Sequence, residues 1–284
     1  MISMAPTIAL ADALFAGEFA GFAALAAVTF VAAAVNSVAG GGTILTFPAL
    51  AAILPPGADR LVVANATSTI GLWPGALSAA WAYRGEREGR PPFSRCLVAP
   101  SVVGALVGAW LVVVLPPHWF AAVVPWLILV AAVLFALQPQ IVGLATRLRG
   151  PAGAGTGTEA EANLPAACAL QFLVAVYGGY FGAGIGILML AMLGLLGLGD
   201  IHRLNAVKNV LGMVVNGVAA LFFAVGSFAG SHAVSWPHAA VMAAGAVGGG
   251  LAGSLVARRL PARIVRRAVA LIAFALAGYY FATG

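Results

Sequence analysis

The chain has 284 residues, of which 62% are hydrophobic and only 8% are charged, and its formal net charge is +6. About a quarter of the residues of a soluble domain are charged, so this composition excludes an ordinary soluble protein and predicts an integral membrane protein. The basic residues gather in short segments between apolar runs, a pattern that sets membrane topology and argues against a nucleic-acid partner.

Long apolar runs predict the helices in chain order. A membrane-spanning helix needs about 20 apolar residues. Runs of this kind cover 17–35, 62–83, 96–115, 118–138, 164–177, 204–226, 235–257 and 262–282. Two shorter runs, 43–54 and 185–198, follow the first and fifth long runs after the glycine-rich breaks VAGGGT and GGYFGAGIG. No Lys or Arg precedes the first run, so a cleaved signal peptide is not expected.

The distribution of Lys and Arg predicts the orientation of these helices. Four segments, 84–95, 139–163, 200–208 and 258–267, carry nearly all the basic residues, whereas the connections 115–118 and 227–234 carry none. The positive-inside rule places the basic segments in the cytoplasm of a cell with an inner membrane, and both chain ends outside. Segments 1–60 and 164–202 then begin and end on the same side, so each is a hairpin that turns at its glycine break. The pattern leaves open whether each hairpin crosses the membrane fully or turns back midway.

The two halves of the chain resemble each other. A shift of 142 residues places Gly40 on Gly182 and Gly42 on Gly184. We therefore predict an all-α polytopic membrane protein of two inverted-topology repeats, each a glycine-broken helical hairpin plus three transmembrane helices. The repeats are expected at 1–138 and 164–284, with a cytoplasmic polar linker at 139–163. Secondary transporters built in this way bind substrate near the membrane midplane, at their broken helices.

The breaks are suited to an anion. A helix that starts at a glycine turn presents unpaired N–H groups and a partial positive charge. Small hydrogen-bonding side chains lie at the first break: Asn36, Ser37 and Thr43. The next long helix in each half carries a polar patch, which comprises Asn65, Thr67, Ser68 and Thr69 in the first half and Asn205, Lys208 and Asn209 in the second. Two positions are open for the Lys208 ammonium group, inside a binding cavity or extended to the cytoplasmic surface.

Catalysis and metal binding have little support in the sequence. An intramembrane enzyme with Ser37 as nucleophile would need a histidine at membrane depth, and none of the four histidines is placed there. The sequence contains no HExxH motif and no carboxylate inside a confident span, and the two cysteines have no metal-binding spacing. We expect no enzyme activity, no metal and no cofactor.

The stretches NSVAGGGTILTFPAL, ANATSTIGLWPGALSAAWAYRGE and GGYFGAGIGILMLAML resemble the sulfite exporter TauE/SafE family of membrane permeases. The resemblance implies a transporter of sulfite, an organosulfonate or a related sulfur-containing or carboxylate anion. It implies substrate-binding roles for Asn36, Ser37, Gly40, Gly41, Gly42, Thr43, Thr67, Ser68, Gly178, Gly179, Gly182, Gly184, Lys208 and Asn209. The second-half helix reads AVKNVLG where a pair of hydroxyls is expected, so the two halves of the site are not chemically equivalent.

The leading hypothesis is therefore a secondary permease in the inner membrane, with a small anion and the lipid bilayer as its partners. The alternatives are a channel-like anion pore and a non-transporting membrane partner of a sulfur-handling complex. The residues leave open which anion is carried, in which direction, with which coupling ion, and whether two copies form a homodimer.

Overall fold

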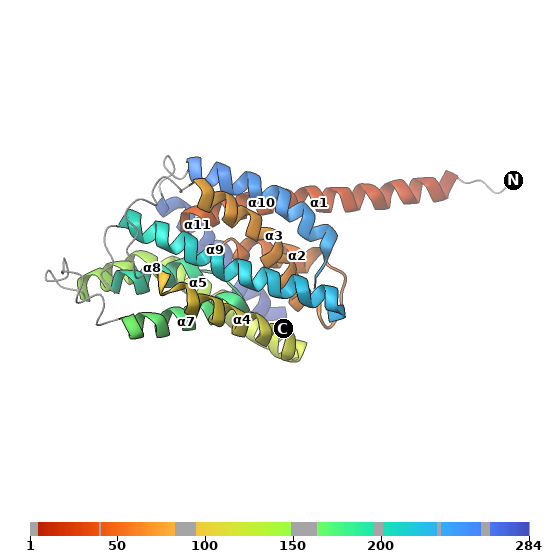
Figure 1. Ribbon diagram of the computed structural model, residues 1–284. Coiled ribbons are helices and arrows are strands. Elements are labelled where there is room, and N and C mark those ends of the chain that lie inside the picture. The colour runs from red at the N-terminus through yellow and green to blue at the C-terminus, as the bar shows by residue number, and fades with distance from the viewer. Residues whose placement is uncertain are drawn as a thin grey trace.

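The computed structural model describes residues 5–39, 41–82, 95–148, 164–195, 201–231, 234–256 and 262–283. These residues form one helical bundle, beyond which the N-terminal part of the first helix projects (Figure 1). The first half comprises α1 (Ala5–Ala39), α2 (Thr43–Ile53), α3 (Arg60–Ala82), α4 (Val98–Val114) and α5 (Pro117–Leu148). The second half comprises α7 (Leu164–Tyr180), α8 (Ile185–Leu195), α9 (Ile201–Gly226), α10 (Trp236–Val256) and α11 (Ala262–Thr283).

Each predicted apolar run forms a helix that matches it to within a few residues where the structure describes it, but two helices are much longer than expected. α1 begins at Ala5, and α5 continues to Leu148, into the segment predicted to be a polar linker. The sequence IVGLA at 141–145 is apolar enough to continue the helix beyond Pro139. The remainder of that linker, Gly40, and residues 84–94 and 258–261 of two basic segments lie outside the described residues.

The short helices α2 and α8 determine how the two hairpins lie. Each has 11 residues, and their bounds differ by 142 positions at both ends. At 1.5 Å per residue each helix is about 16 Å long, roughly half the thickness of a bilayer's hydrocarbon core. Neither helix as described is long enough to cross a bilayer's hydrocarbon core by itself. Leu54 ends α2 in an extended conformation because Pro55 follows it.

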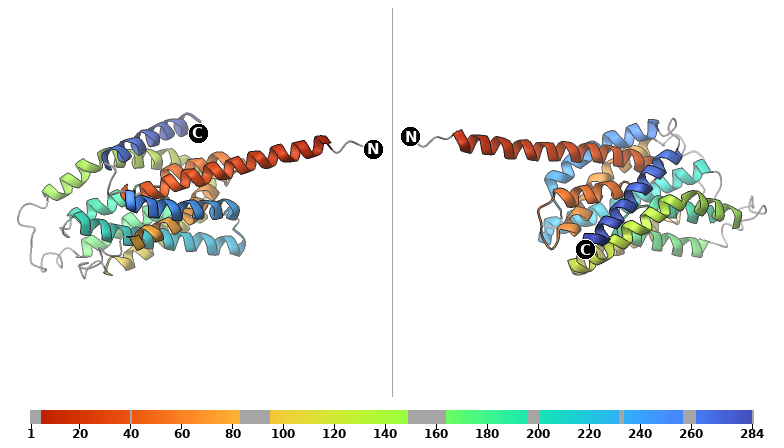
Figure 2. Two further views of the ribbon diagram at one scale, coloured as in Figure 1. Left: turned by 90° about the horizontal axis from the view of Figure 1, so that it is seen from above. Right: turned by 180° about the vertical axis from the view of Figure 1, so that it is seen from behind.

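The helices pack in a reciprocal pattern. α1 lies mainly against α10, and α7 mainly against α4. α3 packs on α10 and α9, α4 also packs on α9, and α5 pairs with α11. Figure 2 shows α5 and α11 crossing on one side of the bundle. This arrangement places α2, α8 and both glycine breaks in the middle of the molecule.

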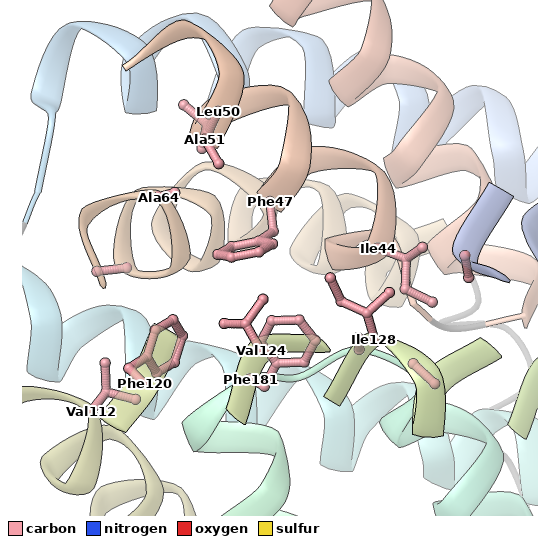
Figure 3. Close-up of a cluster of buried hydrophobic side chains, with 14 of the residues drawn as sticks. Ile44, Phe47, Leu50, Ala51, Ala64, Val112, Phe120, Val124, Ile128 and Phe181 are labelled. Atoms are coloured by element: carbon pink, nitrogen blue, oxygen red, sulfur yellow. The ribbon is translucent and has the colours of Figure 1, made fainter. Parts of the chain in front are cut away.

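Aromatic side chains fill the core beside the breaks (Figure 3). Phe47 of α2 packs edge-on against Phe181 of the second break, with ring centroids 5.4 Å apart, and against Phe120 of α5 at 6.4 Å. All three are fully buried or nearly so. The outward faces carry exposed apolar side chains such as Trp126 and Leu221, whereas polar groups such as Asn65 and Gln171 are buried.

Candidate functional site

The two glycine breaks lie next to each other in space, although 142 residues separate them in the sequence. Gly41 has a φ of 123°, and a Cβ atom there would lie 3.3 Å from the Gly184 nitrogen and overlap the ring of Phe135. Gly182 has a φ of 80°, and a Cβ atom there would lie 3.7 Å from the Thr43 hydroxyl oxygen. Positive φ is accessible to glycine at little cost, and the absent side chains allow the breaks to approach each other.

Asn36 caps the first break. Its Oδ1 atom accepts hydrogen bonds from the backbone N–H groups of Gly41, at 2.8 Å, and Gly42, at 3.4 Å. Free N–H groups at the start of a helix need such partners when they are buried. The Asn36 side chain therefore occupies two backbone N–H groups before α2 that were predicted to bind an anion.

A small cavity of about 40 Å³ lies beside Asn36. It is lined by the end of α1, one face of α3, the first turns of α8 and the middle of α9. Its lining residues are Asn36, Ser37, Ala76, Ala79, Ile185, Gly186, Met189, Lys208, Asn209, Gly212, Met213 and Asn216. Ile185, Gly186 and Met189 lie on one side of the first two turns of α8, so the cavity lies close to the N-terminal end of this helix, which carries a partial positive charge.

Lys208 is the charged residue of this cavity. Its side chain is only 3% exposed, and its Nζ atom has no hydrogen-bond partner within the described part of the chain. The ammonium group thus does not extend to the surface, which was one of the two positions that the sequence left open. A buried ammonium group without a counter-charge is costly, whereas an anion in the cavity would compensate it.

The structure brings together four of the predicted site residues around the cavity: Asn36, Ser37, Lys208 and Asn209. The Ser37 hydroxyl donates to the Ala34 carbonyl at 2.8 Å, so its proton is used within α1 and the hydroxyl oxygen keeps both lone pairs as acceptors. Gly41, Gly42, Thr43, Gly182 and Gly184 form the crossing of the two breaks and do not line the cavity.

The remaining predicted residues lie elsewhere and have structural contacts. The Thr67 hydroxyl oxygen accepts a hydrogen bond of 2.9 Å from the Ser235 N–H group just before α10. The Ser68 hydroxyl is 2.6 Å from that of Thr46, and both side chains are fully buried. Gly178 packs against Val215, and Gly179 against the backbone of Ala105. Their assignment to the substrate site stays a prediction.

Asn216 is a cavity residue that the predicted site did not include. It lies on α9 with Asn209, Gly212 and Met213, at positions i, i+3, i+4 and i+7, which form one stripe along a helix. This spacing, counted forward from Asn209, is the signal in the sequence that would have identified it. Among the described residues no group of three His, Cys, Asp or Glu side chains is placed to hold a metal ion.

These features define the class of the protein. Five helices in the described residues are long and apolar enough to cross a bilayer, and the exposed faces are apolar while polar groups gather inside. The molecule is a multi-pass helical membrane protein with two broken helices that meet in its interior.

Comparison with known proteins identifies the family. The model of the family described as "Sulfite exporter TauE/SafE" matches residues 25–280, and the chain belongs to this family. The resemblance expected from the glycine-rich motifs is thus confirmed. The chain is also 30% identical over 250 residues to a Sinorhizobium protein described as "Probable membrane transporter protein ORF9", and the match covers 87% of each chain. No solved structure matches. Both matches are described as transporters, so the general role is that of a membrane permease.

Proposed function

We propose that the protein is a secondary permease for a small anion, bound in the cavity between the two broken helices. The observation that carries this proposal is the buried Lys208 ammonium group, which has no partner among the described residues and lines the cavity with Asn36, Asn209 and Asn216. The N-terminal end of α8 adds a second source of positive potential. An anion there would be held by one formal charge, amide donors and a helix dipole.

The size of the cavity favours a compact oxyanion. A volume of about 40 Å³ holds roughly three water-sized groups at 10–15 Å³ each. Sulfite, the anion named in the family's description, is of this order. Organosulfonates and carboxylates with longer carbon chains would need the cavity to widen. We therefore place sulfite or a similar small sulfur oxyanion first among the candidate substrates.

The transport mechanism proposed for this site is alternating access between two inverted repeats, 1–138 and 164–284. The reciprocal packing of α1 on α10 and of α7 on α4 supports such a repeat, as does the offset of 142 residues between α2 and α8. In secondary transporters of this construction, one repeat moves against the other around a central site. The basic segments 84–95, 139–163, 200–208 and 258–267 are proposed to face the cytoplasm, across the inner membrane of the cell.

The test is an anion titration of the purified full-length protein, followed by thermal unfolding. Sulfite, thiosulfate, sulfoacetate, taurine, acetate, sulfate and chloride would be compared, because a ligand that binds the folded state raises Tm. We expect stabilisation by sulfite that is lost in Lys208→Met, with at least about a tenfold loss of affinity, because a hydrogen bond to a charged group contributes ~1.5–3 kcal/mol. Arg95→Gln, which removes an exposed charge that does not line the cavity, is the control and should behave as wild type.

Undiminished sulfite binding by Lys208→Met would refute this site. Flux measurements in sealed vesicles then distinguish the modes of action. Saturable flux with counterflow is expected of a permease, whereas non-saturating flux would indicate a pore. A complete lack of flux for every anion would indicate a non-transporting membrane partner.

A further inference from the structure

A second and much larger cavity lies between α5 and α11. Its volume is about 540 Å³, more than ten times that of the cavity at Lys208. The α5 side is formed by Phe135, Ala136, Pro139 and Gln140, and the α11 side by Arg266, Arg267, Ala270, Leu271 and Phe274. The cavity is therefore a groove between two helices that pair on one side of the bundle (Figure 2).

The chemistry of the groove changes along its length. The arginines Arg266 and Arg267 and the amide of Gln140 lie towards one end, in the second turn of α11 and late in α5. One to two turns further along α11, the lining consists of Ala270, Leu271 and Phe274. Leu271 is 71% exposed and Phe274 is 41% exposed, so this part of the groove opens to the outer surface of the bundle. In a membrane protein that surface faces lipid.

We propose that this groove binds an acidic phospholipid, with the phosphate at Arg266 and Arg267 and an acyl chain over Leu271 and Phe274. Arginine matches phosphate by charge and by the fork geometry of its N–H groups. Basic pockets between transmembrane helices on the cytoplasmic side are suited to anionic headgroups. The segment 258–267 carries five arginines in the sequence, which places this end of the groove at the leaflet that the positive-inside rule assigns to the cytoplasm.

Phe135 lies between the groove and the glycine breaks. Phe135 forms its inner wall with 1% of the side chain exposed, and the same ring lies against Gly41 and near Gly184. A lipid chain in the groove would therefore contact Phe135, the residue that packs against both glycine breaks. The buried aromatic ring on the inner side and the exposed apolar side chains on the outer side favour a lipid over a soluble anion on its way to the inner cavity.

The experiment is a lipid titration of the detergent-purified full-length protein, with bound lipids counted by native mass spectrometry. Phosphatidylglycerol, phosphatidylcholine and soluble glycerol phosphate are the three probes. We expect phosphatidylglycerol to bind about tenfold or more tightly than phosphatidylcholine, and glycerol phosphate alone not to bind, because the site uses both charge and apolar contact. The double variant Arg266→Gln/Arg267→Gln should lose this preference, and Arg95→Gln, an exposed arginine outside the groove, should keep it.

A second variant separates loss of binding from loss of folding. Leu271→Trp keeps both arginines and changes an exposed side chain, so the variant should fold normally. The larger tryptophan side chain should fill part of the groove and therefore weaken phosphatidylglycerol binding. Equal binding of the two lipids by wild type, or an undiminished preference in the double variant, would overturn the proposal. Full binding of glycerol phosphate would make the groove a soluble-anion site instead. Cross-linking of two copies through Leu271→Cys in lipid-replete membranes would make a second chain its occupant, and would also overturn the proposal.

Discussion

At the scale of single residues, the glycine breaks combine two requirements that no other residue meets. Gly41 has a positive φ, and its lack of a Cβ atom leaves room for the Phe135 ring. Gly184 also has a positive φ, 78°, and lies beside the same ring. Asn36 satisfies the donors that the first break exposes. Asn36 therefore occupies two backbone N–H groups that were predicted to contact an anion, and Lys208 on α9 is the charged residue that lines the nearby cavity.

We expect Gly41→Ala to destabilise the protein strongly. The added Cβ would overlap the Phe135 ring, and alanine at a φ of 123° is strained, a cost of about 1–3 kcal/mol from the backbone alone. Thermal unfolding in detergent measures the effect. Gly278→Ala on α11 is the control, because nothing lies within 4 Å of a Cβ atom placed there. A Tm for Gly41→Ala equal to that of the control would show that the break relaxes freely.

At the scale of helices, α1 packs closely on α10 and α7 on α4, because glycines at these contacts allow the two backbones to approach each other. A Cβ atom on Gly249 would overlap the Phe30 carbonyl oxygen of α1. One on Gly108 would overlap the Val176 carbonyl oxygen and lie 2.7 Å from the Tyr180 nitrogen of α7. Small residues at helix contacts are favoured in membranes, where association depends on van der Waals packing and not on the hydrophobic effect.

Gly249→Leu and Gly108→Leu are therefore expected to separate their helix pairs. Each should lower the yield of folded protein and reduce the Tm, because the helices must move apart to accommodate the side chain. Size-exclusion chromatography and thermal unfolding in detergent measure both. Gly278→Leu, with open space around it, should fold normally. If the variants of Gly249 and Gly108 matched Gly278→Leu in both measurements, the close packing at these two glycines would be wrong.

At the scale of the whole molecule, orientation follows from the charge pattern and can be read with the chain's own cysteines. Cys96 is exposed just before α4, next to the basic segment 84–95. Ser227 lies at the other end of the bundle, in the π-helical turn Ser227–Ser231 that follows α9. In a Cys168→Ser background, a membrane-impermeant maleimide should label Cys96 only after the membrane is permeabilised. Ser227→Cys, with Cys96 also replaced by serine, should label in intact cells. The reverse pattern would invert the proposed topology.

Much of the architecture could be predicted from apolar patterning. The runs 43–54 and 185–198 became α2 and α8, and the predicted breaks separate them from α1 and α7. Hydropathy is a local property, so it located helices well. It predicted the end of α5 less well, because the apolar stretch beyond Pro139 is short and bordered by polar residues.

The candidate site was only partly predictable. Asn36, Ser37, Lys208 and Asn209 do line one cavity, but Thr67 and Ser68 make hydrogen bonds to other parts of the protein. A polar patch on a membrane helix predicts that these side chains are buried inside the protein, but it does not predict which residues they contact. Asn216 was missed because its partners lie on other helices, and only the stripe from Asn209 pointed to it.

The sequence by itself determined that the chain is a membrane protein, where its helices break and to which family it belongs, since composition, hydropathy and short glycine motifs act locally. Only the tertiary structure decided that the two breaks touch, that Asn36 caps its own break and that Lys208 is buried beside it. The contact between the breaks and the burial of Lys208 beside Asn36 join residues more than 100 positions apart, and such contacts are set by how the helices pack. The Asn36 cap spans only five or six positions, but it depends on the backbone turn at Gly41.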